Sequence, residues 1–281
     1  MVSNRQRTLP EIDHTSVTQY WESVKSSILG PYMMDNFGFP VSAGDFRFRT
    51  EAKVVRRILR NETLNGTVLD LGSGVGYWAE EFAHRFSQVV AVEGSQALYV
   101  ALKERCAPYS NICTLHGDVM SFEPKGLYSM VYFGGLLMYL DQHKVIALLQ
   151  KLIPHLEPNG VILCRESTVR GKTITRTGNY PVVYRTVQDY GRLFTQSRLT
   201  LQHMERNEPY VLTQMGCELI AKWKRVVPEQ FQALRIVGRL AYWAMRLGYP
   251  WITHLPKILR IPYPYLENHF FMLRTQPMVP Q

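Results

Sequence analysis

The chain is 281 residues long and 46% hydrophobic, which is enough for one large domain with a sizeable core. Its four cysteines lack Cys-x-x-Cys spacing and neighbouring histidines, so we expect reduced thiols and neither a disulfide framework nor a bound metal. No apolar run approaches the roughly 18 residues of a membrane-spanning helix, and the N-terminus lacks the apolar segment of a signal peptide. We therefore expect a cytoplasmic protein, whose net charge of +9 leaves contact with an acidic partner or a membrane surface open.

The first 49 residues have the pattern of a cap over a pocket. A helix is expected over residues 15–29, and it includes the aromatic pair Tyr20 and Trp21. The stretch 32–48 is rich in aromatic residues and methionine, which is more typical of a segment that closes over a ligand than of a strand. A second helix, over residues 50–60, should lead into the first strand.

The most informative motif, Val-Leu-Asp-Leu-Gly-Ser-Gly-Val-Gly, occupies residues 68–76. A short apolar run ends in Asp70, glycines follow at Gly72, Gly74 and Gly76, and a helical pattern comes next. Because glycine accepts positive φ and has no Cβ, such a turn can bring the backbone close to a nucleotide-like ligand. The spacing differs from the dinucleotide fingerprint G-x-G-x-x-G. A plain tight turn between a core strand and a helix is the alternative interpretation.

Four more strands are predicted after this motif, over residues 88–93, 114–119, 128–135 and 161–164. Glu93 ends the first of them, where a carboxylate suits the two hydroxyls of a ribose. Apolar strands that alternate with helical segments predict an α/β fold with a mostly parallel sheet covered on both faces. Ligands bind such sheets outside the carboxyl ends of the strands, where Asp70, Asp118 and Gly134 also fall.

These elements, in this order over roughly residues 50–225, resemble class I S-adenosylmethionine-dependent methyltransferases. The resemblance implies a Rossmann-like sheet of seven mostly parallel strands with helices on both faces, an N-terminal helical cap and a C-terminal helical extension. It also implies S-adenosyl-L-methionine as the cofactor. The residues that it assigns to cofactor binding are Asp70, Gly72, Ser73, Gly74, Gly76, Glu93, Gly94, Asp118, Val119, Phe133, Gly134 and, from the cap, Tyr20. Simple packing is the alternative role for Tyr20.

The side chains after the fifth apolar run are candidates for catalysis. Arg165, Glu166 and Ser167 are expected just past the apolar part of that strand, at the mouth where substrate meets the methyl group. Methyl transfer requires alignment and, where the nucleophile bears a proton, a general base. Glu166 is the predicted base, and a salt bridge to Arg165 or Arg170 is the alternative interpretation.

Residues 168–195 form a predicted insertion on the substrate side of the sheet. Its first part combines cations with aromatic rings, and Thr186 then begins a helix. Cations over an active site favour an anionic group on the substrate, such as a phosphate or carboxylate. The predicted substrate-binding residues are Arg170, Arg176, Tyr180, Tyr184 and Arg185. A merely solvated loop is the alternative.

The last part of the chain is predicted to be an extension, residues 226–281, beyond an antiparallel hairpin formed by residues 201–205 and 218–223. A helix over residues 229–247 should carry an apolar stripe that includes Leu234 and Leu240. Its basic and aromatic residues leave peripheral membrane contact open, and packing onto the catalytic domain or a second copy in a homodimer is the alternative.

The predicted organisation is therefore a cap (1–49), a cofactor-binding catalytic domain (50–225) and the extension. The expected activity is methyl transfer to a small-molecule acceptor, with a lipid-like or anionic acceptor left open. Signatures of base methylation, Asn/Asp-Pro-Pro-Tyr and Pro-Cys, are missing, so nucleic acid is not expected. A protein N-terminal amine methyltransferase is an alternative, although Arg165-Glu166-Ser167 replaces that family's Lys-Asp-Asn. A non-catalytic, cofactor-binding partner subunit is another.

Overall fold

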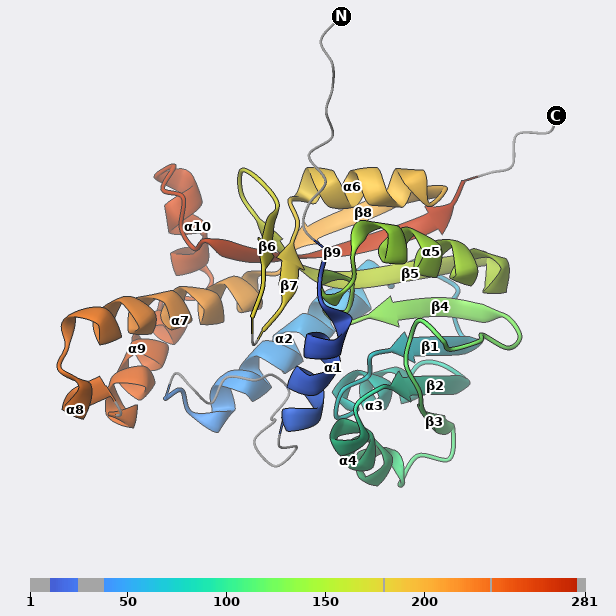
Figure 1. The fold of residues 1–281 in the computed structure, drawn as a ribbon, viewed down its shortest axis with the longest axis horizontal. Helices are drawn as coiled ribbons and strands as arrows, with labels where there is room; N and C mark the ends of the chain where they lie inside the picture. The colour runs from blue at the N-terminus through green and yellow to red at the C-terminus, as the bar shows by residue number, and fades with distance from the viewer. Residues whose placement is uncertain (1–10, 25–37, 179, 233, 277–281) are drawn as a thin grey trace, which may run out of the picture.

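The computed structural model of the chain describes residues 11–24, 38–178, 180–232 and 234–276. A seven-stranded sheet in the order β3-β2-β1-β4-β5-β9-β8 crosses the centre of the molecule (Figure 1). Its strands are β1 (Thr67–Leu71), β2 (Gln88–Glu93), β3 (Ile112–His116), β4 (Tyr128–Phe133), β5 (Leu156–Val169), β8 (Leu199–Arg206) and β9 (Leu266–Thr275). The first five strands are parallel, and β9 runs antiparallel to both β5 and β8. The predicted seven-stranded, mostly parallel Rossmann-like sheet is confirmed.

Each face of the sheet is covered by its own layer of helices. The helices α2 (Val41–Ile58), α3 (Tyr77–Ala83) and α4 (Gln96–Cys106) supply apolar residues to one core, and α5 (Gln142–Leu152) and α6 (Val187–Gln196) supply the other. Strand side chains alternate between the two cores: Val161 and Leu163 of β5 pack with the first layer, and Ile162 and Cys164 with the second. This alternation decides which strand-end residues reach the site.

The cap differs in detail from the predicted one. Helix α1 (His14–Ser23) begins one residue before the expected start, because the Asp13 carboxylate caps it by accepting a hydrogen bond from the Thr15 N–H. Helix α2 already begins at Val41, so part of the predicted lid stretch is helical and packs on the sheet. Residues 32–37 of that stretch and residues 25–29, the expected end of the first helix, lie outside the described residues.

The last strand of the sheet comes from the predicted extension. Residues 218–223, expected to form the second half of a hairpin, lie within helix α7 (Glu208–Val226), whose buried residues recur at helical spacing. The strand that pairs with β8 is instead β9, which lies between β5 and β8. A domain boundary after residue 225 would therefore divide the sheet. Residues 207–265 are an insertion between two neighbouring strands.

That insertion also contains the short helix α8 (Glu229–Gln232), α9 (Arg235–Leu247) and α10 (Trp251–Ile258), which lie at one end of the molecule (Figure 1). The predicted helix over 229–247 is thus two helices. The predicted basic-aromatic loop after β5 forms a hairpin of β6 (Ile174–Arg176) and β7 (Val182–Tyr184). The 3-10 turns η3 (Leu137–Tyr139) and η4 (Ile153–His155) complete the described elements.

Candidate active site

A cavity of about 1210 Å³ opens at the carboxyl ends of the central strands. The glycine turn after β1 and the ends of β2 and β4 form its floor, and α1, the β6–β7 hairpin and α7 surround it. The volume exceeds the usual range for a single drug-sized ligand, roughly 300 to 1,000 Å³. It therefore has room for a cofactor and an acceptor together.

The predicted glycine turn has the backbone that its sequence requires. Gly72, Gly74 and Gly76 have φ values of 71°, 57° and 90°, in the region that side-chain-bearing residues rarely occupy. The Gly72 and Ser73 N–H groups donate to the Val92 carbonyl, which ties the turn to β2. Gly72, Ser73 and Gly74 line the cavity. Gly76 is not among the lining residues: a Cβ there would lie 2.8 Å from Leu102 Cδ1, so this glycine permits close packing of α4.

Glu93 is the side chain that joins the turn to the second strand. Its Oε2 accepts a hydrogen bond from the Gly74 N–H (2.8 Å), and its Oε1 accepts one from the Ser95 N–H (2.9 Å). Burial raises the pKa of this carboxyl, against the backbone donors of Ser95, Gly74 and Gly94, which lower it. Glu93 lines the cavity, and so do Gly94 and the Asp118–Val119 pair after β3. Their roles in binding the sugar and the base stay predictions.

Three buried polar atoms at the floor have no hydrogen-bond partner among the described residues: Asp70 Oδ2, Trp78 Nε1 and the Tyr132 hydroxyl. Asp70 and Tyr132 are register partners on β1 and β4, and the Tyr132 and Trp78 rings lie 5.0 Å apart. All three residues line the cavity. Unpaired buried polar groups are costly, so this acceptor and these donors suit a ligand with both an ammonium and a carboxylate group, as the methionyl part of S-adenosylmethionine has.

Asp70 is a strongly perturbed carboxyl on this floor. Burial raises its pKa from 3.8 to about 7, against a hydrogen bond from Ser73 and the charge of Arg165 on β5, which both lower it. A positively charged ligand group beside Oδ2 would stabilise the ionised form and lower the pKa again. The floor therefore fits the cationic end of the cofactor.

The other half of the cavity is lined by tyrosines: Tyr20 of the cap, Tyr139 after β4, Tyr180 and Tyr184 of the hairpin, and Tyr210 of α7. The hydroxyls of Tyr139 and Tyr180 lie 2.6 Å apart, and the rings of Tyr20 and Tyr180 are 4.8 Å apart, edge to face. Burial raises the pKa of Tyr180 to about 12 and that of Tyr139 well above its ordinary value. These phenols are therefore neutral at physiological pH and offer both ring faces and hydroxyl groups to an acceptor.

Only one of the three predicted substrate-binding arginines borders the cavity. Arg176 lines it, with its guanidinium 5.2 Å from the centre of the Tyr184 ring. Arg170 instead pairs with Glu267 (2.5 Å) and donates to the Ile261 carbonyl, which fixes the hairpin to β9 and the loop before it. Arg185 is buried and donates to the Leu137 and Leu140 carbonyls. Both are therefore structural, and the prediction that they bind substrate is not supported by the geometry.

In the structure, the Glu166 side chain lies away from the site. Because β5 continues to Val169, alternation places Arg165 and Ser167 on the cavity side and turns Glu166 to the opposite face. There its carboxylate is fully buried and accepts hydrogen bonds from the Leu136 and Leu137 N–H groups, both at 3.0 Å. The predicted general base thus has no access to the cavity. The prediction that Phe133 binds the cofactor is not supported for the same reason, because its side chain faces the core formed with α5 and α6.

Several lining residues were not predicted from the sequence. Arg47 comes from α2, Thr213 and Cys217 from α7, and Asn268 from β9. The Asn268 Oδ1 accepts from the Asn207 amide, which also donates to Glu51 of α2, so the insertion is tied to both β9 and α2. No local motif marks these residues, because they reach the cavity only through long-range packing.

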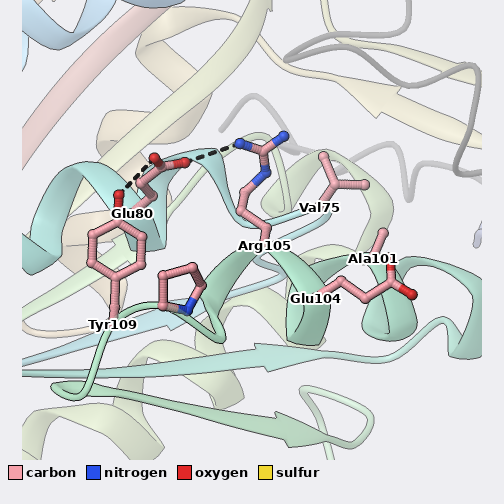
Figure 2. Close-up of a pocket in the computed structure, with 7 residues that line it drawn as sticks. Val75, Glu80, Ala101, Glu104, Arg105 and Tyr109 are labelled. Atoms are coloured by element: carbon pink, nitrogen blue, oxygen red, sulfur yellow. Dashed lines mark hydrogen bonds and ion pairs between the residues drawn. The ribbon is translucent and has the colours of Figure 1, made fainter.

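A second hollow, of about 420 Å³, lies between α3 and α4 (Figure 2). Its polar side chains pair with one another: the Glu80 carboxylate accepts from the Arg105 guanidinium and from the Tyr109 hydroxyl. The Arg105 guanidinium also lies 3.7 Å from the centre of the Tyr77 ring. The larger cavity has room for a cofactor and an acceptor together and lies at the strand ends, so it is the candidate active site.

Comparisons with known proteins agree with this assignment. Residues 68–160, from β1 into β5, match the family described as "Methyltransferase domain". Phosphoethanolamine N-methyltransferase 3 of Arabidopsis thaliana is 28% identical over 170 residues, which are 59% of this chain and 34% of that protein. A ribosomal RNA small subunit methyltransferase A of Dehalococcoides mccartyi is 26% identical over 126 residues, 44% of this chain and 43% of that protein. The chain thus spans less than half the length of these curated relatives.

Solved structures share the fold at low sequence identity. A SAM-dependent methyltransferase of Leishmania major superposes with a TM-score of 0.64 at 13% identity, covering 93% of this chain and 82% of that one. The DhpI–SAH complex gives a TM-score of 0.56 at 15% identity, covering 94% and 97%. Residues 68–160 therefore match a methyltransferase domain, and the Rossmann-like sheet is the fold that this chain shares with S-adenosylmethionine-dependent methyltransferases.

Proposed function

We propose that the chain transfers the methyl group of S-adenosylmethionine to a small-molecule acceptor that carries an amine and an anionic group. The tyrosine-lined half of the cavity is the observation that carries this proposal. Aromatic ring faces attract alkylammonium groups, and neutral phenol hydroxyls can orient an amine nitrogen. Arg176 at the rim suits a phosphate or carboxylate at the other end of the acceptor.

The names of the curated relatives support the same substrate class. The first relative described above is named for methylation of phosphoethanolamine, a compound with a primary amine and a phosphate. The relatives named for ribosomal RNA make RNA a second candidate acceptor. We favour the small acceptor because the tyrosine cluster is enclosed by the cap and the hairpin, as suits a compact ligand.

In the proposed reaction, the cofactor supplies a methyl group bonded to a positively charged sulfur. The floor residues Asp70, Trp78 and Tyr132 would hold its methionyl end, and Glu93 its sugar. The ammonium group of the acceptor would first lose a proton to water. The tyrosines would then align the neutral amine, whose lone pair would attack the methyl carbon as the carbon–sulfur bond breaks and S-adenosylhomocysteine leaves. No carboxylate base is required, which is consistent with the burial of Glu166 on the far side of β5.

The test is the release of S-adenosylhomocysteine from purified protein incubated with S-adenosylmethionine and one acceptor at a time. Phosphoethanolamine, ethanolamine, a peptide with a free N-terminus and ribosomal RNA form the panel. We expect turnover with phosphoethanolamine and little with ethanolamine. Tight cofactor binding without turnover on any acceptor would favour a non-catalytic partner subunit, and turnover on RNA or peptide alone would refute the proposal.

The variant Arg176→Gln tests the contact with the anionic end of the acceptor separately from the contacts with its amine. We expect the KM for phosphoethanolamine to rise roughly ten-fold with kcat little changed, because a charge-assisted contact contributes about 1.5 to 3 kcal/mol. Lys172→Gln is the matched control, since Lys172 is an exposed cation on the same segment that does not line the cavity. Equal kinetic constants for the wild type and Arg176→Gln would show that Arg176 does not contact the acceptor.

A further inference from the structure

The 207–265 insertion exposes many large apolar side chains. Most of the large hydrophobic side chains that the described residues leave exposed belong to it. On α9 the exposed members are Ile236, Leu240, Trp243 and Leu247, which are 52% to 86% accessible. Their spacing of four, three and four residues places them on one stripe along the helix.

This stripe is distinct from the one that holds α9 to the protein. The buried residues of α9 are Gly238, Tyr242 and Met245, and Met245 packs against Leu212 and Val211 of α7. Helix α9 therefore has two apolar sides, one used for folding and one left uncovered. Leu240 of the predicted stripe belongs to the uncovered side, and Leu234 is exposed just before α9 begins.

Helix α10 repeats the pattern. Trp251, Leu255 and Ile258 follow the same four-and-three spacing and are 51% to 79% accessible, while Thr253 and Pro256 are buried. Figure 1 shows α9 and α10 at the same end of the molecule, connected to the sheet through α7 and β9. Uncovered apolar area of this extent marks an interaction surface.

The charge of the insertion identifies the partner. Residues 207–265 contain eight lysines and arginines and three acidic residues, Glu208, Glu218 and Glu229. On α9, Arg235 and Arg239 are exposed and lie along the border of the apolar stripe, and Lys257 and Arg260 are exposed at the end of α10. Tryptophan and leucine beside a row of arginines is the pattern of a helix that lies in the interface of an anionic membrane.

We infer that α9 and α10 form a docking surface for an anionic lipid bilayer. Two copies of this surface would bring like charges face to face, which disfavours a homodimer through it. Nucleic acid would match the charge but not the leucine and isoleucine side chains. Along the described residues no helix has the length and apolar content to cross a membrane, so the contact is interfacial. The inference does not depend on the proposed acceptor.

The test is co-sedimentation of the full chain with vesicles of phosphatidylcholine alone and of phosphatidylcholine mixed with phosphatidylglycerol. We expect binding to the anionic vesicles that weakens as salt is added, and much weaker binding to the neutral ones. The double variant Leu240→Ser with Trp243→Ser should lose roughly ten-fold or more of the affinity. Arg235→Gln and Arg239→Gln should each lose roughly five-fold.

The matched control is Val100→Ser with Leu127→Ser, two exposed apolar residues outside the insertion, which should bind like the wild type. Unchanged cofactor binding by calorimetry would show that each variant is folded. The inference is overturned if the wild type stays in the supernatant with both kinds of vesicle, or if the Leu240/Trp243 variant still sediments fully. Loss of a dimer in that variant, without vesicle binding by the wild type, would assign the surface to a second copy instead.

Discussion

Replacing Glu166 by glutamine should change how stability depends on pH while leaving catalysis intact. The wild-type carboxylate is fully buried, and burial raises its pKa from 4.5 to about 7. This difference corresponds to about 3 kcal/mol at roughly 1.4 kcal/mol per unit of pKa. The folded state holds the Glu166 proton more tightly than the unfolded state. The stability that this proton contributes is therefore fully present below the unfolded pKa and is lost as pH rises through the folded pKa.

Glutamine keeps an oxygen that can accept from the Leu136 and Leu137 N–H groups, and it does not titrate. We therefore expect the free energy of unfolding of the wild type to fall by about 3 kcal/mol more than that of Glu166→Gln between about pH 4.5 and pH 8. Urea unfolding measured at several pH values for both proteins provides the comparison. Glu104→Gln, an exposed carboxyl on α4, is the control and should follow the wild type.

Activity supplies the second half of this test. We expect turnover of Glu166→Gln within about two-fold of the wild type, because the side chain does not reach the cavity. A loss of a hundred-fold or more in kcat with unchanged cofactor affinity would restore Glu166 as the base. Identical pH dependence of stability in both proteins would refute the assignment of a raised pKa to this carboxyl.

Three further substitutions examine the cofactor half of the site. Gly76→Ala should lower the free energy of unfolding by about 1 to 3 kcal/mol, measured by thermal or urea denaturation, because of its φ of 90° and the contact with Leu102. Gly74→Ala has open space around it and should weaken cofactor binding more than stability; the reverse ranking would contradict the geometry. Cofactor affinity of the wild type should rise roughly ten-fold between about pH 6 and pH 8, as Asp70 ionises, and Asp70→Asn should flatten this rise. An unchanged pH profile in the variant would show that Asp70 does not contact the ammonium group of the cofactor.

The sheet and the cofactor half of the cavity could be predicted because their signals are local. The turn that follows Asp70 needs left-handed backbone at Gly72, Gly74 and Gly76, and apolar strands recur at regular spacing. The predicted direction of the side chains at the end of β5 was wrong, because the sequence indicated a strand that ends at Cys164. Once the strand continues to Val169, its period of two sends Glu166 to the far face.

The rest could not be predicted because it depends on long-range packing. The sequence of residues 218–223 predicts a strand, but the segment is part of α7. Its helical pattern of buried residues becomes visible only once the packing of α7 against α2 and α9 is known. Gly216 leaves room for Met245 and Phe39, and this contact selects which apolar side of α9 is buried. The sequence shows that α9 is apolar, but only the structure shows that one of its two stripes is uncovered.

Calorimetric titration of the purified protein with S-adenosylhomocysteine tests the central claim, that the cavity at the strand ends binds the cofactor. We predict binding at one site per chain, weakened roughly ten-fold or more in Glu93→Ala, where the Gly74 N–H loses its acceptor. The Glu104→Ala control should bind like the wild type. An absence of measurable heat for the wild type, or equal affinity in Glu93→Ala, would contradict the account.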